Sequence, residues 1–246
     1  MKKIIIVSIT IFALLFTFTT PVIAADNNTQ GQAKASDKGP KISSDIERVD
    51  FIHYAKPAKV AGGKTDPGYK LMGVKWPAET AVKYVINPNN LDGISDDDVK
   101  SAISAADETW DSATSVELFD NDGYVSDQPV VYGVFDSQNS IGFGRYLGNN
   151  NVIAITSVWY NRKTKEIVEF DMLFNTNYNW GVNGFGGVMD LQSIATHEFG
   201  HSVGLDDVYS ASYTFVTMYG YSNVDDIIKR DLAAQDIAGL RNMYGQ

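Results

Sequence analysis

The residues with the clearest chemical pattern are His197, Glu198, His201, Gly204 and Asp207, which follow one another as H-E-x-x-H-x-x-G-x-x-D. Residues four apart lie on one face of a helix, so His197 and His201 can place both imidazoles on one metal ion. Glu198 follows the first histidine, where it can act as general base for a metal-bound water. The spacing therefore predicts a metal site with a base beside it.

The end of the pattern predicts a third ligand. Gly204 can end the helix, because glycine enters left-handed backbone conformations at little cost, and the reversed chain can bring Asp207 back to the metal. Asp206 is a competing ligand, although the spacing favours Asp207. Three protein ligands and a water are typical of catalytic zinc, whereas structural zinc usually has four protein ligands. The alternative is a helix with two incidental surface histidines and a glycine cap.

Residues 1–25 have the features of a secretory signal peptide. Two lysines precede an apolar run over residues 4–18, and the segment ends in small residues. The run is short for a membrane span, so an uncleaved anchor is the less favoured alternative. We therefore expect a secreted, extracellular protein that has no membrane contact once the signal is removed.

The composition restricts the partners. The formal net charge is −10, and loss of the two signal lysines would make it more negative, which argues against nucleic acid and anionic membranes as partners. The chain has no cysteine, so disulfides and latency through a cysteine thiolate on zinc are excluded. Calcium is possible because many carboxylates fall in loops. The segment 120–123 fits a plain turn better than a calcium loop.

The chain divides into a signal peptide (1–25), a linker or pro-segment (26–68) and a catalytic domain (69–246). The linker lacks apolar residues up to about residue 45. The stretch from Ile46 to Lys59 has enough apolar side chains to dock against the domain. His53 lies in this stretch. A blocking pro-segment that reaches zinc through His53 is conceivable, but an ordinary, partly buried histidine is the favoured interpretation.

Hydrophobic periodicity predicts an α+β domain. Alternating or continuous apolar residues predict strands at 80–86, 130–135, 151–159 and 166–174, and residues 137–151 are predicted to form a long loop. Three helices are expected. The first is capped by Ser95, the metal helix by Asp190, and the last begins at Arg230 or Asp231 and ends at Gly245.

The zinc pattern, followed by Met218 eleven residues after Asp207, resembles the metzincins, in which a methionine turn lies beneath the metal. Within that clan the chain is most similar to matrixin-type peptidases in their small secreted bacterial or archaeal form. Further runs that support the likeness are 73–77, 170–180, 191–197 and 236–240. The resemblance implies a twisted, mostly parallel sheet with an antiparallel edge strand, an active-site helix and a C-terminal helix.

The resemblance also implies roles for individual residues. His197, His201 and Asp207 would bind one catalytic zinc ion, although most metzincins have histidine in place of the aspartate. Glu198 would activate the water and pass its proton to the leaving amine, and Met218 would form the floor by packing. An extended substrate would pair with an edge strand formed by Asn151, Val152, Ile153, Ala154, Ile155 and Thr156.

The pattern and the resemblance together predict a secreted zinc-dependent endopeptidase, which would hydrolyse peptide bonds by Glu-assisted attack of a zinc-bound water. Its partner would be a protein or peptide substrate, and we expect a monomer. One alternative is a catalytically silent secreted binding protein on a metallopeptidase scaffold; the presence of Glu198 with all three ligands argues against it. Another is a zinc hydrolase limited to cell-wall peptides or to self-processing, such as removal of residues 26 to about 65.

Overall fold

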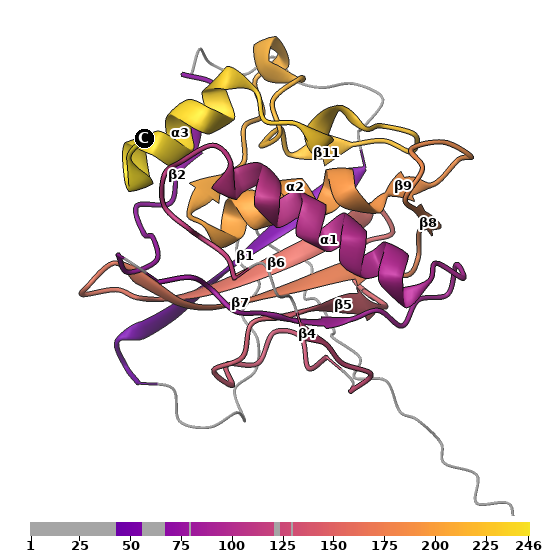
Figure 1. The fold of residues 1–246 in the computed structure, drawn as a ribbon, viewed down its shortest axis with the longest axis horizontal. Coiled ribbons are helices and arrows are strands. Elements are labelled where there is room, and N and C mark those ends of the chain that lie inside the picture. The colour runs from indigo at the N-terminus through magenta and orange to yellow at the C-terminus, as the bar shows by residue number, and fades with distance from the viewer. Residues whose placement is uncertain (1–42, 56–66, 79, 121–123, 129) are drawn as a thin grey trace, which may run out of the picture.

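The structure is a computed structural model that describes residues 43–55, 67–78, 80–120, 124–128 and 130–246 (Figure 1). The predicted signal peptide and most of the predicted linker lie outside the described residues, and so does most of the segment 120–123. In the described part, no helix is long and apolar enough to cross a membrane.

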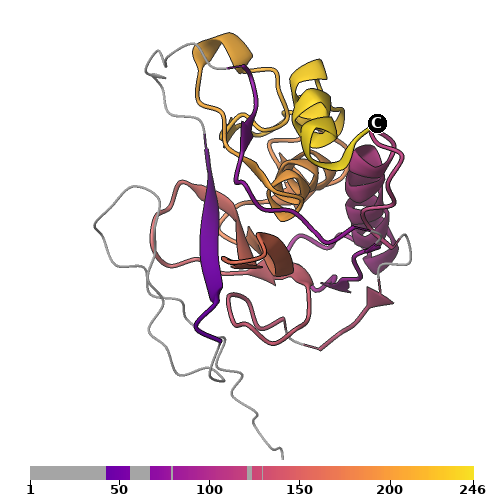
Figure 2. The ribbon, with the colours of Figure 1, turned by 90° about the vertical axis from the view of Figure 1, so that its left-hand side faces the viewer.

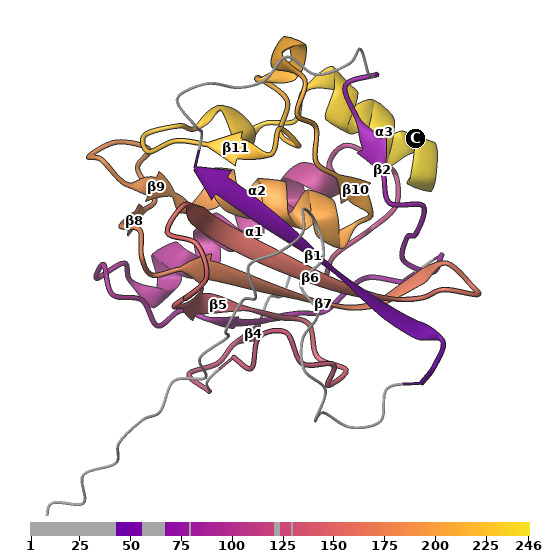
Figure 3. The ribbon, with the colours of Figure 1, turned by 180° about the vertical axis from the view of Figure 1, so that it is seen from behind.

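The centre of the described part is a seven-stranded sheet in the order β11-β1-β6-β7-β5-β3-β4 (Figures 1 and 3). The strands are β1 (Ile46–Ala55), β3 (Val85–Asn87), β4 (Tyr124–Val125), β5 (Ser140–Gly144), β6 (Val152–Asn161), β7 (Glu166–Asn175) and β11 (Tyr221–Ser222). β6 runs antiparallel to both of its neighbours, whereas the other pairs are parallel. The expected mostly parallel sheet with one antiparallel strand is confirmed.

The resemblance implied that the antiparallel strand lies at the edge of the sheet. In the structure β6 is an inner strand, because β1 and β11 lie outside it. β1 pairs with β6 from Ile46, opposite Asn161, to Tyr54, opposite Val152. β11 then pairs with the outer side of β1. The prediction that the stretch after Ile46 docks is confirmed. Its alternate residues face opposite sides of the sheet, so that Phe51 packs into the main core while Ile52 packs against the cluster on the other face.

The described part contains three α-helices: α1 (Asp96–Asp111), α2 (Leu191–Ser202) and α3 (Ala234–Tyr244). α1 and α2 pack against each other on one face of the sheet (Figures 1 and 2). The predicted caps are confirmed, since Ser95 accepts from the N–H of Asp98 and Asp190 accepts from that of Ser193. The last helix begins later than predicted, because a 3-10 turn, η2 (Ile228–Arg230), comes first.

Short elements complete the chain. They are β2 (Lys70–Leu71) paired with β10 (Leu205–Asp206), β8 (Trp180–Gly181) paired with β9 (Met189–Asp190), and the 3-10 turn η1 (Ala211–Tyr213). β10 comes directly after the metal helix, and its pairing with β2 directs the chain that leads into Asp207.

The prediction of a strand at 130–135 is wrong, because the structure has no strand there. A strand, β5, lies instead within the segment 137–151 that was predicted to be a loop. Gly133 has φ +75°, which turns the chain, and Val131 is 49% exposed. The glycines of β5 made it resemble a loop, but they are close-packed. A Cβ on Gly144 would lie 2.6 Å from Leu173, and one on Gly142 would lie 3.0 Å from a side chain of the preceding loop.

A buried acid in α1 predicts a pH-dependent contribution to stability. Asp107 is 1% exposed and accepts a hydrogen bond from the hydroxyl of Tyr84. Burial raises the pKa of Asp107 to about 7, although that hydrogen bond opposes the shift. The folded chain therefore keeps this proton while the unfolded chain loses it, so the stabilisation is complete below about pH 4 and is lost as pH rises to about 7.

We expect Asp107→Asn to raise the free energy of unfolding at pH 8 relative to wild type, by up to about 4 kcal/mol, because the amide keeps an acceptor without the charge. At pH 4 the two proteins should be much closer. Urea unfolding at both pH values measures the difference. An equal difference at pH 4 and pH 8 would contradict a raised pKa.

Candidate metal centre

The helix α2 and the turn after it position the predicted metal-binding residues. α2 carries His197, Glu198 and His201 and ends at Ser202. Gly204 has φ +105°, and a Cβ there would collide with the carbonyl oxygen of Val74. Only glycine fits this position, as its conformation and the close backbone contact both require. The chain then reverses into β10, as the spacing predicted.

Three ligand atoms converge where the chain returns. The Nε2 atoms of His197 and His201 lie 3.2 Å apart. Oδ1 of Asp207 lies 3.3 Å from the first and 3.6 Å from the second. Ligand atoms bound tetrahedrally to zinc at about 2.0–2.1 Å are about 3.3–3.4 Å apart. Oδ1 of Asp207 is also buried without a hydrogen-bond partner. The donor set and its spacing therefore fit a zinc ion.

Backbone carbonyls orient both imidazoles. Nδ1 of His197 donates to the carbonyl of Thr217 at 2.7 Å, and Nδ1 of His201 donates to that of Leu205 at 3.0 Å. Because a carbonyl can only accept, each Nε2 keeps its lone pair toward the shared centre. This outer arrangement is the usual support of a metal-binding histidine.

The protonation states also suit a cation. Burial lowers the pKa of His197 to about 3, so its imidazole is neutral. Burial alone would raise the pKa of Asp207, but positive charge on either neighbouring histidine and a hydrogen bond from Tyr209 lower it. The hydroxyl of Tyr209 donates to Oδ2 at 2.8 Å, which leaves Oδ1 for the centre. Neutral imidazoles and an ionised carboxylate are the forms that bind metals.

Asp207, rather than Asp206, faces the two histidines. The carboxylate of Asp206 forms an ion pair with Lys70 and is 25% exposed. Its other oxygen accepts the backbone N–H of Asp207 at 2.7 Å. This geometry agrees with the spacing in the sequence, which favoured Asp207.

The predicted base is held by two hydrogen bonds. The hydroxyl of Thr156 donates to Oε2 of Glu198 at 2.6 Å, and Nδ1 of His53 shares a hydrogen bond of 3.0 Å with Oε1. Burial raises the pKa of Glu198 to about 8, although the bond from Thr156 opposes this. A neighbouring metal cation favours the ionised form. Sequence reasoning assigned Thr156 to substrate binding, and its contact with Glu198 had no local signal.

Met218 lies directly beneath α2, where the resemblance placed it. It is fully buried, and its sulfur leaves no room for a Cβ on Gly200. The carboxylate of Asp236 accepts the backbone N–H groups of Thr217 and Met218 at 2.9 and 3.1 Å. Sequence reasoning missed Asp236, which lies in the first turn of α3 and fixes the methionine turn from there.

His53 lies in the centre, so the favoured interpretation of an ordinary, partly buried histidine was wrong. The side chain is 0% exposed. Its ring lies 3.9 Å from that of His197, and its Nε2 is 3.0 Å from the hydroxyl of Ser222. The strand order explains the difference, because β1 lies between β6 and β11 and directs this face toward α2.

Lys229 is a second residue that sequence reasoning missed. Its Nζ donates to the carbonyl of Tyr219 and lies 3.0 Å from Nδ1 of His197. Burial lowers the pKa of Lys229 to about 8, while the carboxylates of Asp207 and Glu198 oppose the shift. The lysine follows two exposed residues, Ile227 and Ile228, so no local pattern indicated that it is buried.

Two groups of described residues could hold a metal ion, His197–His201–Asp207 and His53–His197–Glu198. They share His197. Both contain two imidazoles, which suit zinc better than calcium, because calcium prefers oxygen ligands. Calcium therefore stays a prediction from composition.

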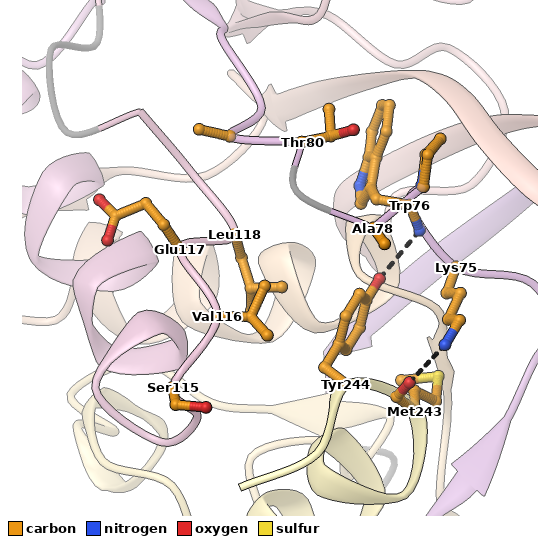
Figure 4. A pocket seen from close by; sticks show the side chains of 12 residues that line it. Lys75, Trp76, Ala78, Thr80, Ser115, Val116, Glu117, Leu118, Met243 and Tyr244 are labelled. Atoms are coloured by element: carbon orange, nitrogen blue, oxygen red, sulfur yellow. Dashed lines mark hydrogen bonds between the residues drawn. The ribbon is translucent and has the colours of Figure 1, made fainter.

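A cleft of about 660 Å³ lies beside the centre and is lined by residues of β1 and by Asp207, Tyr209 and Tyr221. Asp207 is the only proposed ligand that lines it, because the side chains of His197 and His201 are fully buried. Another hollow, of about 410 Å³, lies between Trp76 and the C-terminal helix (Figure 4). Figure 4 shows Tyr244 accepting the backbone N–H of Trp76 there. That second hollow contains none of the predicted site residues.

Residues 75–245 match the family described as Matrixin. The chain is 26% identical over 180 residues to karilysin from Tannerella forsythia, covering 73% of this chain and 35% of that protein. It is 27% identical over 173 residues to the hatching enzyme of Paracentrotus lividus, covering 70% and 27%. It is 26% identical over 200 residues to metalloendoproteinase 1-MMP of Arabidopsis thaliana, covering 80% and 49%. The chain thus spans about a quarter to a half of the length of these relatives.

Proposed function

The chain belongs to the matrixin family, and from that premise we propose that it is a secreted zinc-dependent endopeptidase that acts as a monomer on protein or peptide substrates. The family implies a zinc metallopeptidase. One observation carries the proposal: three buried ligand atoms lie 3.2–3.6 Å apart, with the carboxylate of Glu198 on the same helix.

His197, His201 and Asp207 would hold the zinc ion. When bound, zinc supplies Lewis acidity, which lowers the pKa of a water and polarises the scissile carbonyl. Glu198 accepts the proton of the attacking water on a carboxylate oxygen and later delivers it to the leaving amine. Thr156 acts as a positioning residue, because its hydrogen bond fixes the carboxylate of Glu198.

The substrate would pair as an extended strand with residues 151–156, along the edge of β6 that pairs with β1. Main-chain hydrogen bonds to such an edge bind a peptide without regard to most of its side chains. In the structure β1 forms these pairs itself, so a substrate must take its place.

The test is hydrolysis of a quenched fluorescent peptide by the zinc-loaded chain, measured with and without a chelator. We expect hydrolysis with zinc, its loss on chelation, and its return when zinc is restored. Equal hydrolysis in the presence of a chelator that has removed the metal would contradict zinc dependence. Zinc binding without hydrolysis of any peptide or protein substrate would favour a catalytically silent binding protein.

A further inference from the structure

Strand β1 contributes side chains to the metal centre, although it lies outside the region that matches the family. The match begins at residue 75, after β1 has ended. Phe51 stacks on His201 with ring centroids 4.1 Å apart and an interplanar angle of 9°. Two residues later, on the same face of the strand, the ring of His53 lies 3.9 Å from that of His197. β1 therefore covers both metal-directed histidines.

β1 also occupies the backbone edge that a substrate would need. It is antiparallel to β6, with Phe51 opposite Thr156 and Tyr54 opposite Val152 (Figure 3). Each N–H and C=O on that edge can pair with only one strand at a time, so no peptide can add there while β1 is in place. Tyr54 pairs with Tyr221 of β11 on the other side, so the C-terminal end of β1 is held on both edges.

The same strand engages the base. Oε2 of Glu198 is taken by the hydroxyl of Thr156, and Oε1 is taken by His53. A carboxylate oxygen can accept more than one hydrogen bond, so His53 competes with an attacking water for Oε1 rather than filling it. His53 is the partner that belongs to β1, and the hydroxyl of Ser222 and the amine of Lys229 hold its other nitrogen in place. Departure of β1 would free the carboxylate oxygen.

We propose that β1 is a built-in inhibitory strand, which occupies the substrate edge of β6 and engages Glu198 through His53, so that the peptidase stays latent until β1 leaves. This inference rests on the proposed function and adds its regulation. A tethered strand competes with free substrate at an effective concentration on the order of mM. The chain has no cysteine, so this latency relies on strand pairing and hydrogen bonds.

The test compares full-length, zinc-loaded wild type with His53→Ala. We expect His53→Ala to raise kcat/KM for a short quenched peptide by roughly 10–100-fold, the range for loss of a hydrogen bond to a charged group. Glu47→Ala is the matched control. Glu47 lies on the same strand, is exposed, and contacts Tyr160 and Arg162 rather than the centre. The kcat/KM of Glu47→Ala should stay within about fivefold of that of wild type.

Ile52→Ala loosens the strand without touching the metal centre. Ile52 packs on the opposite face, against the cluster that contains Val152, Ile155 and Leu173. We expect this variant to raise kcat/KM as well, with faster hydrogen exchange of β1 amides than in wild type. If His53→Ala does not fold, Ile52→Ala decides the question alone.

A synthetic peptide with the sequence of residues 46–55 provides an independent measurement. It should inhibit the His53→Ala chain competitively with substrate, and a peptide with alanine in place of the histidine should inhibit more weakly. Lack of inhibition by the native peptide would contradict occupation of the substrate edge.

The remaining outcomes separate this inference from the proposed function. Activity in His53→Ala and Ile52→Ala that is equal to or lower than in wild type, with zinc bound, would overturn the inhibitory role and leave the peptidase intact. A lower value in His53→Ala alone would make His53 part of the active machinery. Absence of hydrolysis in all chains, with β1 amides exchanging faster in the variants, would overturn the peptidase itself.

Discussion

Glu198→Gln should lower kcat for peptide hydrolysis by about 10²–10⁴-fold, the contribution typical of a general base. The amide has nearly the same shape as the carboxylate and can still be held by Thr156, but it cannot accept the proton of the attacking water. Steady-state kinetics with the zinc-loaded protein measure the effect. The variant should be made both in wild type and in the His53→Ala chain, so that latency does not hide the loss.

The control for this variant is metal binding. Glu198 contributes none of the three atoms that surround the proposed zinc position. Zinc affinity, measured by competition with a chelator, should therefore change little. A Glu198→Gln protein that binds zinc and turns over peptide at the wild-type rate would show that another group is the base. A variant that loses zinc would instead show that Glu198 acts on the metal.

Asp207→Ala should lower zinc affinity by more than the roughly 10–100-fold that is typical of an outer partner of a metal site. The substitution leaves His197 and His201 as the remaining proposed ligands and removes the acceptor of the Tyr209 hydroxyl. Peptide hydrolysis should be lost at low zinc concentration. Competition with a chelator gives the affinity, and kinetics at several zinc concentrations show whether added metal restores activity.

Asp206→Ala is the matched control, because the two aspartates are neighbours and differ in direction. Asp206 pairs with Lys70 near the surface, and such an exposed pair contributes about 0–1 kcal/mol, so zinc affinity should change by no more than about fivefold. A larger loss of zinc in Asp206→Ala than in Asp207→Ala would reverse the assignment of the third ligand.

Sequence reasoning succeeded where one short segment decides the geometry. The spacing of His197 and His201 on a helix depends only on helical periodicity. Gly204 had to end that helix, and its φ of +105° agrees. The caps at Ser95 and Asp190 are likewise local, since each accepts an N–H three residues later. Backbone geometry within a few residues therefore predicted the metal helix, its direction and its end.

The tertiary structure decided everything that depends on distant partners. His53 and Glu198 are 145 positions apart, and only the insertion of β1 between β6 and β11 brings them together. The hydrogen bonds from the methionine turn to Asp236 depend likewise on how helices and turns pack. So does the burial of Lys229 beside His197. Sequence alone predicted a zinc-type ligand set with its base. The order of the strands determined that a strand of the same chain covers it, because sheet pairing joins segments that no local pattern connects.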